Sequence, residues 1–433
     1  MFKIKIKNSY LVAFVIILTL VFLFIYNLYQ KKDIKYSDNK LIANSEALFD
    51  LNFGNNKLTK FKKVEVDLDL FGFVKSKNFD NFNAFQSLFN YYDGKNVELV
   101  MPSGNYGVSF NKTPKFFLNN KGASHAGIKI PSNVHFNGNN LNLYVLENLS
   151  ARTHVFTNSD WEKGNSNIVI RNINIFTNGR GIKKKGTDYR INGISLIRTK
   201  NSTIDKVSII DGYGYGIWLW SSSNNTIINS YVSEFEDGIE LARESQYNLI
   251  FNNRVEMLRS KDSSKWGNSL LIAFSYANNN YFLSNSLINN RGTAIKTIST
   301  YGAGNKNIFE KNTIKSGQYG IGIILNGVGN IVKDNLILVE QEPAIALPKF
   351  YIDVEDTSII NNLIYSNNYK KDLPKFSYGN STIKIGKKFK NLKIKNNVIY
   401  YKYGSSINKN YKFDGKNVIK KIRNPISFRS LIN

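Results

Sequence analysis

The sequence predicts an all-β solenoid, in which successive coils of the chain stack along one axis. The main observation is a pattern of eight residues that occurs eight times, from STIDKVSI at Ser202 to LKIKNNVI at Leu392. The starts are separated by 23, 23, 32, 27, 23, 27 and 35 residues, so that loops of variable length extend an otherwise constant coil. Repeats of about 20–50 residues are typical of solenoids, because one repeat cannot bury its apolar face without a neighbour. The eight starts are Ser202, Asn225, Asn248, Asn280, Asn307, Asn330, Thr357 and Leu392.

A second observation is that each repeat reads as strands rather than helices. The repeats are short, rich in β-branched residues and bounded by Gly, Asn and Ser, which is the pattern of a strand. Another apolar stretch follows each repeat after a Gly-rich corner, as in GIWLW at 216–220 and GIELA at 238–242. Side chains alternate along a strand, which predicts one inward stack and one outward row. The predicted inward stack is Ile217, Ile239, Ile295, Ile321 and Ile345, and the predicted outward row is Trp218, Glu240, Lys296, Gly322 and Ala346.

The third observation is an Asn at the sixth position of the last six repeats. Stacked coils place these residues above one another at the strand spacing of ~4.8 Å, so that their amides can hydrogen-bond along the axis. Asn also tolerates the left-handed backbone that a sharp corner needs. We therefore predict a structural Asn ladder rather than a ligand site. Its members are Asn253, Asn285, Asn312, Asn335, Asn362 and Asn397.

The start of the solenoid is predicted from residues 80–140. Phe82, Phe85, Leu88 and Phe89 share one face of a predicted helix that Gly94 ends. Such a helix can cover the open end of the solenoid, which otherwise exposes strand edges and core.

These motifs resemble those of the pectin-lyase-like superfamily of single-stranded right-handed parallel β-helices. The resemblance covers roughly residues 64–400 and is carried by the Asp-Asn-x-x-Ala-x-Gln helix from Asp80, the Pro-x-Gly-x-Tyr turn from Pro102 and the IPSNV stretch from Ile130. It implies a right-handed β-helix and a carbohydrate-active or carbohydrate-binding role. It does not choose a chemistry, because that superfamily includes lyases, hydrolases, epimerases, tailspikes and adhesins.

The N-terminus predicts a membrane anchor. The 20 residues from Tyr10 to Tyr29 carry no charge, which is enough to cross a hydrocarbon core of ~30 Å. The apolar run exceeds the ~7–15 residues of a cleaved signal and no small-x-small site follows it. We expect a signal-anchor helix in residues 1–32, a linker in 33–63 and a β-helix domain in 64–433. We therefore expect a bacterial single-pass membrane protein, and the resemblance implies that its β-helix domain lies outside the cytoplasm.

Composition limits the partners and cofactors. The chain has 433 residues, no Cys, three His and a formal net charge of +26, so that a thiolate or His-rich metal site is not expected. We expect no cofactor and no metal. Residues 366–433 hold 17 Lys and Arg against Asp372 and Asp414, about +15 of the total. Such basicity predicts a polyanionic partner, which is an acidic polysaccharide, an anionic lipid surface or nucleic acid; we expect the polysaccharide and no specific nucleic acid.

Three signatures found in the superfamily are absent from the sequence. There is no Asp-Asp or Gly-His-Gly, as in polygalacturonase-type hydrolases, and no Asp-Pro-His-Asp, as in uronan C5-epimerases. A calcium-dependent lyase needs clustered acids, and the Arg and Lys around Asp211, Asp237 and Glu240 disfavour a bound cation.

The chemically richest stretch is 210–244, which places aromatic, acidic and basic residues on adjacent coils. Aromatic rings bind sugar faces, and Arg or Lys bind carboxylates. Basic residues in 180–190 and the insertion 259–267 are predicted to frame the groove. The candidate catalytic residues are Glu240, Arg243, Lys296, Asp237 and Tyr215. The candidate substrate-binding residues are Trp218, Trp220, Tyr213, Asp211 and Arg180.

Three functions remain open for this groove. β-Elimination needs a cation on the uronate carboxylate, supplied by Arg243 or Lys296, and a base, supplied by Lys296 or Tyr215. Hydrolysis needs two carboxyl groups, supplied by Glu240 with Asp237 or Asp211. A binding or export scaffold needs neither. The bland alternatives are that Asp211-Gly and Asp237-Gly are equivalent turn dipeptides and that Glu240, Arg243 and Lys296 form a solvated ion-pair cluster.

Overall fold

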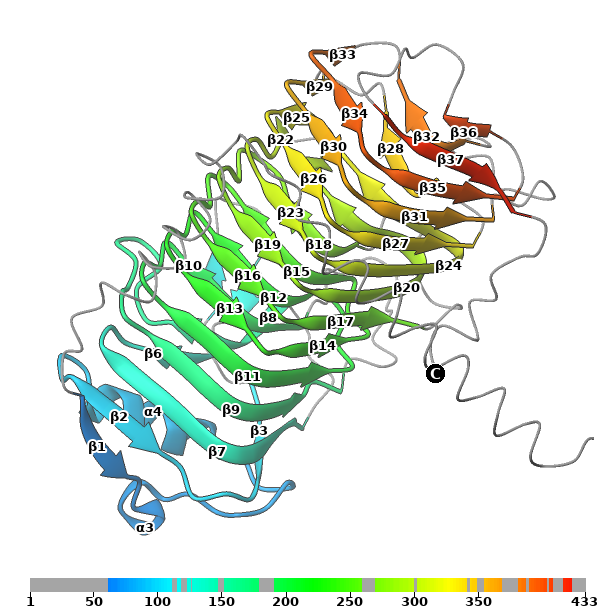
Figure 1. Ribbon diagram of the computed structural model, residues 1–433. Coiled ribbons are helices and arrows are strands. Elements are labelled where there is room, and N and C mark those ends of the chain that lie inside the picture. Colours follow the sequence, from blue (N-terminus) through cyan, green and yellow to red (C-terminus); the bar gives the residue numbers. More distant parts are fainter. Residues whose placement is uncertain are drawn as a thin grey trace, which may run out of the picture. The chain divides into compact units, whose positions relative to one another are not determined.

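The protein is a β-helix whose coils stack parallel strands into three long sheets (Figure 1). The computed structural model describes residues 61–110, 115–117, 123–125, 127–146, 152–178, 191–258, 269–299, 302–340, 343–348, 354–367, 381–386, 389–402, 405–407 and 416–422. Residues 10–29, on which the membrane-anchor prediction rests, lie outside these ranges. Within them, no helix is long and apolar enough to span a membrane.

Sheet 1 contains the first strand of each coil, and every neighbouring pair in it is parallel. Its strands, in order, are β1 (Lys62–Glu65), β2 (Val97–Val100), β7 (Val134–Val145), β9 (Val169–Phe176), β11 (Thr203–Ile210), β13 (Thr226–Ile228), β16 (Leu249–Phe251), β19 (Tyr281–Leu283), β23 (Ile308–Glu310), β26 (Ile331–Lys333), β30 (Ser358–Ile360) and β34 (Lys393–Lys395).

Sheet 2 follows after one corner, and β7, β9 and β11 run through that corner into it. Its further strands are β3 (Asn105–Val108), β14 (Tyr231–Ser233), β17 (Arg254–Met257), β20 (Ser286–Lys296), β24 (Thr313–Ile324), β27 (Leu336–Val339), β31 (Leu363–Ser366), β35 (Val398–Tyr401) and β37 (Val418–Lys421).

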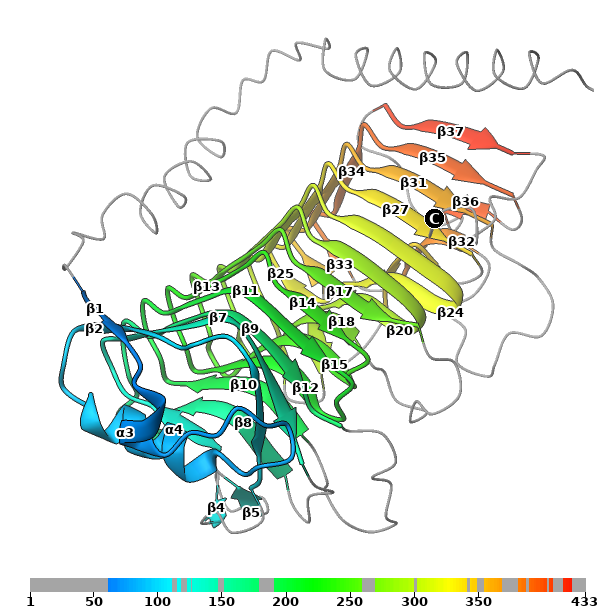
Figure 2. The same ribbon diagram turned by 90° about the horizontal axis from the view of Figure 1, so that it is seen from below.

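Sheet 3 closes each coil, and β20 and β24 extend into it from sheet 2 (Figure 2). Its other strands are β5 (Ala123–His125), β6 (Ile128–Ile130), β8 (Arg152–Asn158), β10 (Ile191–Ile197), β12 (Tyr215–Trp220), β15 (Asp237–Ala242), β18 (Ser269–Ala273), β28 (Ile345–Leu347), β32 (Ser381–Ile385) and β36 (Ser405–Ile407). Small additions are β4 (Lys115–Phe117), β21 (Ile298–Ser299), β22 (Gly302–Ala303), β25 (Gly327–Val328), β29 (Val354–Glu355) and β33 (Phe389–Lys390).

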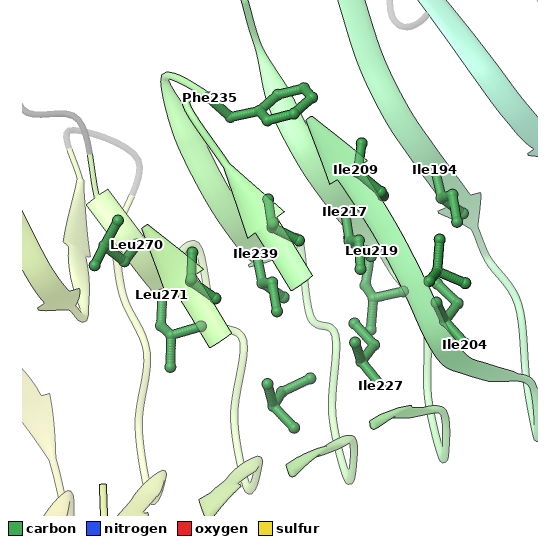
Figure 3. Close-up of a cluster of buried hydrophobic side chains, with 14 of the residues drawn as sticks. Ile194, Ile204, Ile209, Ile217, Leu219, Ile227, Phe235, Ile239, Leu270 and Leu271 are labelled. Carbon is green, nitrogen blue, oxygen red and sulfur yellow. The ribbon is translucent and has the colours of Figure 1, made fainter. Parts of the chain in front are cut away.

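The inward stack of sheet 3 has the predicted register in its first coils. Ile217 pairs with Ile239, and Ile239 pairs with Leu271 (Figure 3). The stack continues to Ile295, and all four residues are fully buried. The prediction for the next coil is wrong. Ile323, not Ile321, pairs with Ile295, and Ile324 takes the outward place assigned to Gly322. Ile321 packs with Ile324 and Ala346 and not with the inward stack. The reason is the sequence GIGII, in which two Ile two residues apart fit the stack equally well.

The predicted Asn ladder is confirmed at the corner between sheets 1 and 2. Asn312 Nδ2 donates to Asn335 Oδ1 at 3.1 Å and to the Phe282 carbonyl at 3.0 Å, and the Asn312 backbone N–H donates to the same Asn335 Oδ1 at 2.8 Å. The pattern repeats from Asn253 and ends at Asn417, one coil beyond the predicted series. Each amide satisfies backbone groups that the corner removes from the sheets.

The left-handed residue of each corner is the one before the ladder Asn, not the ladder Asn itself. Asn252, Lys311 and Asp334, among others, have φ between 53° and 58°. The ladder Asn is therefore selected for its amide, and the neighbouring position accepts several residue types. A second ladder, not predicted, joins the first residues of four repeats: Asn225 Nδ2 donates to Asn248 Oδ1, and the series continues to Asn280 and Asn307.

The capping helix is confirmed as α4 (Phe82–Tyr91), with a short α3 (Leu68–Phe71) before it. Phe85, Leu88 and Phe89 are fully buried, and Phe85 packs edge-on against Phe136 and Phe156 of the first coils. The Tyr106 hydroxyl of the Pro-x-Gly-x-Tyr turn donates to the Pro102 carbonyl at 2.8 Å. The helix therefore covers core residues that the first coil would leave exposed.

Candidate functional site on the outer face of sheet 3

The predicted site residues lie on two outward rows of sheet 3. One row aligns Ser195, Trp218, Glu240, Ile272 and Lys296, as the register of β10, β12, β15, β18 and β20 shows. The other row includes Asn192, Tyr215, Asp237 and Ser269. The prediction that Trp218, Glu240 and Lys296 share an outward row is confirmed.

Trp218, predicted to bind substrate, and Glu240, predicted to be catalytic, are both buried. Both residues point away from the core of the coil, yet each is only 2% exposed. The Trp218 indole N–H donates to Glu240 Oε1 at 2.9 Å, and a buried carboxylate needs such a donor. Glu240 therefore holds the indole in place.

Trp218 is buried because other rings pack against it. The His154 ring stacks on it at a centroid distance of 5.8 Å, and the Tyr215 ring stacks at 5.3 Å. Trp220 packs edge-on at 4.8 Å, and Trp161 packs edge-on against His154 at 5.2 Å. We call His154, Trp161, Tyr215, Trp218 and Trp220 the aromatic cluster.

His154 is fully buried and was not predicted from the sequence. The Tyr215 backbone N–H donates to Asn192 Oδ1 at 3.0 Å, which turns Asn192 Nδ2 toward His154 Nδ1 at 3.1 Å. Because an amide nitrogen only donates, His154 Nδ1 must accept, and the ring then carries its proton on Nε2. Ser195 Oγ lies 2.7 Å from the same Nδ1, so that the contacts favour a neutral imidazole. The only feature of the sequence that could have drawn attention to His154 as a site residue is that the chain has just three histidines.

Trp220 is the part of the aromatic cluster that a ligand can reach together with a cation. It is half-buried at the end of β12, and the guanidinium carbon of Arg243 lies 5.2 Å from the ring centroid. Arg243 has a left-handed φ of 51° in the turn after β15. A guanidinium over an indole is a cation–π arrangement, and its outer N–H groups can bind a carboxylate.

The remaining basic and acidic candidates do not converge on Trp218. Lys296 is half-buried and lies two strands beyond Glu240, with buried Ile272 between them; two strand steps are roughly 10 Å. Asp237 begins β15, and its Oδ1 accepts the Ser269 backbone N–H at 3.0 Å. Its carboxylate thus bridges two coils.

Asp211 and Asp237 do not occupy equivalent corners, contrary to the prediction. Asp211 has a left-handed φ of 69° and is a turn residue, as predicted for it. Its counterpart on the next coil is Glu234, with φ 61°, because Ile210 pairs with Ser233. Asp211 and Asp237 are 26 residues apart, whereas the coil here is 23 residues long, so the residue equivalent to Asp211 lies three positions before Asp237. Tyr213 is half-buried between this turn and β12. Arg180, the basic stretch 180–190 and the whole insertion 259–267 lie outside the described residues.

No group of three or more His, Asp or Glu within the described ranges is arranged to hold a metal ion. The outward row of Ser195 and Trp218 continues toward the N-terminus through Thr157 of β8 to Lys129 of β6. Burial lowers the pKa of the Lys129 ammonium. The face therefore combines rings, hydrogen-bonding side chains and single cations.

Comparison with known proteins supports the fold. A family model described as the right-handed β-helix region matches residues 161–337. No curated protein sequence matches the chain. Among solved structures, the A-module of the Azotobacter vinelandii mannuronan C-5 epimerase AlgE4 aligns with a TM-score of 0.58 at 12% identity, covering 83% of this chain and 96% of that one.

Two further structures align over most of this chain. A tailspike protein mutant of Escherichia coli bacteriophage HK620, in complex with a pentasaccharide, has a TM-score of 0.57 at 13% identity and covers 79% of this chain and 62% of that one. The surface adhesin PfbA of Streptococcus pneumoniae has a TM-score of 0.53 at 15% identity, over 84% and 89%. At these identities the likeness shows the fold.

Proposed function

We propose that this chain, which has a right-handed parallel β-helix fold, binds an acidic polysaccharide on the outer face of sheet 3. The observation that carries the proposal is the partly exposed Trp220 ring with the Arg243 guanidinium above it. A ring offers a surface for the apolar face of a sugar, and the guanidinium beside it offers paired donors for a uronate carboxylate.

The charge of the chain favours an acidic ligand. The formal net charge is +26, which raises the local concentration of a polyanion at the surface. Structures that share the fold include an epimerase of mannuronan and a tailspike in complex with a pentasaccharide. These likenesses support a saccharide ligand in general, and the acidity is argued from this chain's own charge.

Hydrolysis is the least supported chemistry at this face. A glycoside hydrolase uses two carboxyl groups that reach the scissile bond. Glu240 is 2% exposed and accepts the Trp218 N–H, Asp237 accepts a backbone N–H, and Asp211 lies in a turn. These contacts assign structural work to all three carboxylates.

β-Elimination at the same face is the second candidate. Lys296 lies in the outward row of Glu240 and is half-buried, so that it can approach a chain lying along the coils. In such a reaction Arg243 would neutralise the uronate carboxylate, which acidifies the C5 proton, and Lys296 or Tyr215 would remove that proton. The separation of Lys296 from Trp218 favours binding as the first proposal.

The experiment is a binding titration of the full chain against a panel of uronic and neutral polysaccharides, in low and high salt. We expect uronic polysaccharides to bind, and salt to weaken the binding because exposed charges are screened beyond ~8 Å. Arg243→Ala should weaken binding to uronic chains, while Lys95→Ala, which removes an exposed lysine after the capping helix, should leave it unchanged. Wild-type protein that binds none of the panel would refute the proposal.

The same mixtures test elimination. A lyase forms an unsaturated uronate that absorbs ultraviolet light, and Lys296→Ala should then reduce turnover by ~10²-fold or more, the scale of a lost acid–base group. Binding without any rise in absorbance leaves the protein as a binder or export scaffold.

The uncharged segment from Tyr10 to Tyr29 supports a further part of the proposal, which is a single membrane anchor with the β-helix domain outside the cytoplasm. In the producing cell, the chain should resist alkaline extraction from membranes, and protease added outside the cytoplasmic membrane should digest the β-helix domain. Extraction of the chain into the soluble fraction would refute the membrane anchor and would have no bearing on the proposal that the chain binds a polysaccharide.

A further inference from the structure

The outer face of sheet 2 changes character along the solenoid. The strand register aligns two outward rows on this sheet, which pass through Ser208 and Ile210 of β11. On β14, β17, β20 and β24 the two rows are mostly polar and contain Tyr231, Ser233, Arg254, Glu256, Ser286, Ile288, Thr313 and Lys315. On the earlier strands β7, β9 and β11, one row is apolar, with Tyr144, Phe176 and Ile210, and the other is polar, with Asn142, Asn174 and Ser208. On β27, β31 and β35 the same two rows contain Leu336, Leu338, Leu363, Tyr365, Val398 and Tyr400.

We call these last six residues the apolar patch. Their inward neighbours Ile337, Ile364 and Ile399 are fully buried and already supply the core, so the patch is a second apolar surface on the outside of the coil. Five of its members are half-buried and Leu338 is 6% exposed. An outward apolar surface spanning three adjacent strands marks a contact site. Figure 2 shows these strands side by side near the C-terminal end of the solenoid.

The surroundings of the apolar patch are basic. Lys420 and Lys421 of β37 pair with Tyr400 and Tyr401 and are exposed. Lys315 lies one strand before Leu338 in the same row. From Thr357 onward the described residues include no Asp or Glu, and the sequence there contains only Asp372 and Asp414.

We propose that the apolar patch and its lysines form a contact site for an anionic lipid surface. Leu and Val side chains suit the boundary of the acyl region, tyrosines suit the interface, and lysines reach the headgroups while their stems cover apolar surface. Charge complementarity selects an anionic surface. This proposal does not rest on polysaccharide binding, because it concerns sheet 2 and not sheet 3.

The ring geometry favours lipid over sugar as the occupant. Tyr365 and Tyr400 stack on each other with centroids 4.7 Å apart and planes at 8°, so each ring turns one face toward the other. Leu338 and Lys420 flank the stacked pair along the row. The ring faces are thus taken up by neighbours in the row, and the outward surface consists of ring edges and aliphatic side chains.

The chain's lack of cysteine allows a local test in the full-length protein. Leu363→Cys and, separately, Val398→Cys are labelled with an environment-sensitive fluorophore and reconstituted in nanodiscs whose lipids carry a nitroxide on the acyl chain. Ser208→Cys is the matched control, since it lies in the same outward row six strands earlier. Thermal melts verify that each labelled variant folds like the wild type.

We expect quenching at positions 363 and 398 to exceed that at 208 several-fold with anionic lipid, and to fall with zwitterionic lipid or with Lys420→Glu and Lys421→Glu together. Equal quenching at all three positions, or none in either lipid, would overturn the proposal. Protection of the label that depends on the number of protein copies and not on lipid would identify a second copy as the occupant. Protection of the label only by added uronic polysaccharide would identify a sugar site. Protection by a second copy and protection by a polysaccharide would each overturn the lipid proposal.

Discussion

The corner between sheets 1 and 2 and the outer face of sheet 3 are built by opposite rules. At the corner, one buried Asn per coil makes the same contacts from Asn253 to Asn397, whatever residue precedes it. On sheet 3, Ser195, Trp218, Glu240, Ile272 and Lys296 occupy one row with five different side chains.

The difference shows where this solenoid has room for a specific function. A ladder needs identical partners, because each amide must both donate to the next coil and accept from the previous one. The sheet 3 row has no such requirement, and its side chains form individual contacts, such as the Trp218 bond to Glu240. The regular corner fixes the stacking, and the irregular face can vary in sequence without disturbing it.

The largest expected effect is loss of a ladder member. Asn312→Ala removes the acceptor of the Asn285 backbone and side-chain N–H groups and the donor to the Phe282 carbonyl. Because buried groups without partners cost ~1–3 kcal/mol each, the free energy of unfolding should fall by about 2–5 kcal/mol in urea titrations. Asn83→Ala, at an exposed position of α4, should change it little. Equal stability of the two variants would contradict the ladder.

A smaller effect is expected inside the aromatic cluster. Trp218→Phe keeps a ring but removes the N–H that donates to Glu240, so the buried carboxylate loses a donor at a cost of ~1–3 kcal/mol. Thermal melts should show a clear destabilisation for Trp218→Phe and a weaker one for the half-exposed Trp220→Phe. The reverse order would mean that the cluster is not organised around the Trp218–Glu240 bond.

The first coils, which precede the ladder, should be sensitive to acid. Burial, the largest cause, lowers the pKa of His135 from 6.5 to about 4, and the Phe61 ring stacks on it. The His135 imidazole therefore binds a proton less readily in the folded protein than in the unfolded chain. Its contribution to the free energy of unfolding is fully present above about pH 6.5 and is lost as the pH falls toward 4. At pH 5 the loss should be roughly 1–2 kcal/mol. His135→Gln should flatten the pH dependence of the melting temperature, and an unchanged slope would contradict this assignment.

The smallest expected effect tests the ligand-facing edge of the cluster. Trp220→Ala removes a half-exposed ring and the partner of the Arg243 guanidinium. Affinity for a uronic polysaccharide should fall about three- to tenfold, since such contacts contribute ~0.5–1.5 kcal/mol. Tyr91→Ala, at an exposed position at the end of the capping helix and outside the aromatic cluster, should leave the affinity unchanged. Titrations that give both variants the wild-type affinity would place the ligand elsewhere.

The sequence by itself determined the coil, the ladder and the outward row, because each follows from a local pattern repeated at a fixed strand spacing. The six predicted ladder residues and the shared row of Trp218, Glu240 and Lys296 needed no knowledge of distant contacts. The same reasoning failed at GIGII, where two Ile fit one stack and only the pairing with Ile295 chose between them.

Only the tertiary structure decided that Trp218 is buried and that the His154 ring stacks on it. An outward side chain on a strand is exposed unless another coil covers it, and His154 of β8 reaches Trp218 across β10 from more than 60 residues away in the chain. No repeat pattern marks that contact, because the strand that contains His154 precedes the eight repeats. The apolar patch is similar: its residues fit the strand pattern, and only the register placed them together on the outside of sheet 2. Local periodicity fixes which way a side chain points, and packing between distant segments fixes what it meets there.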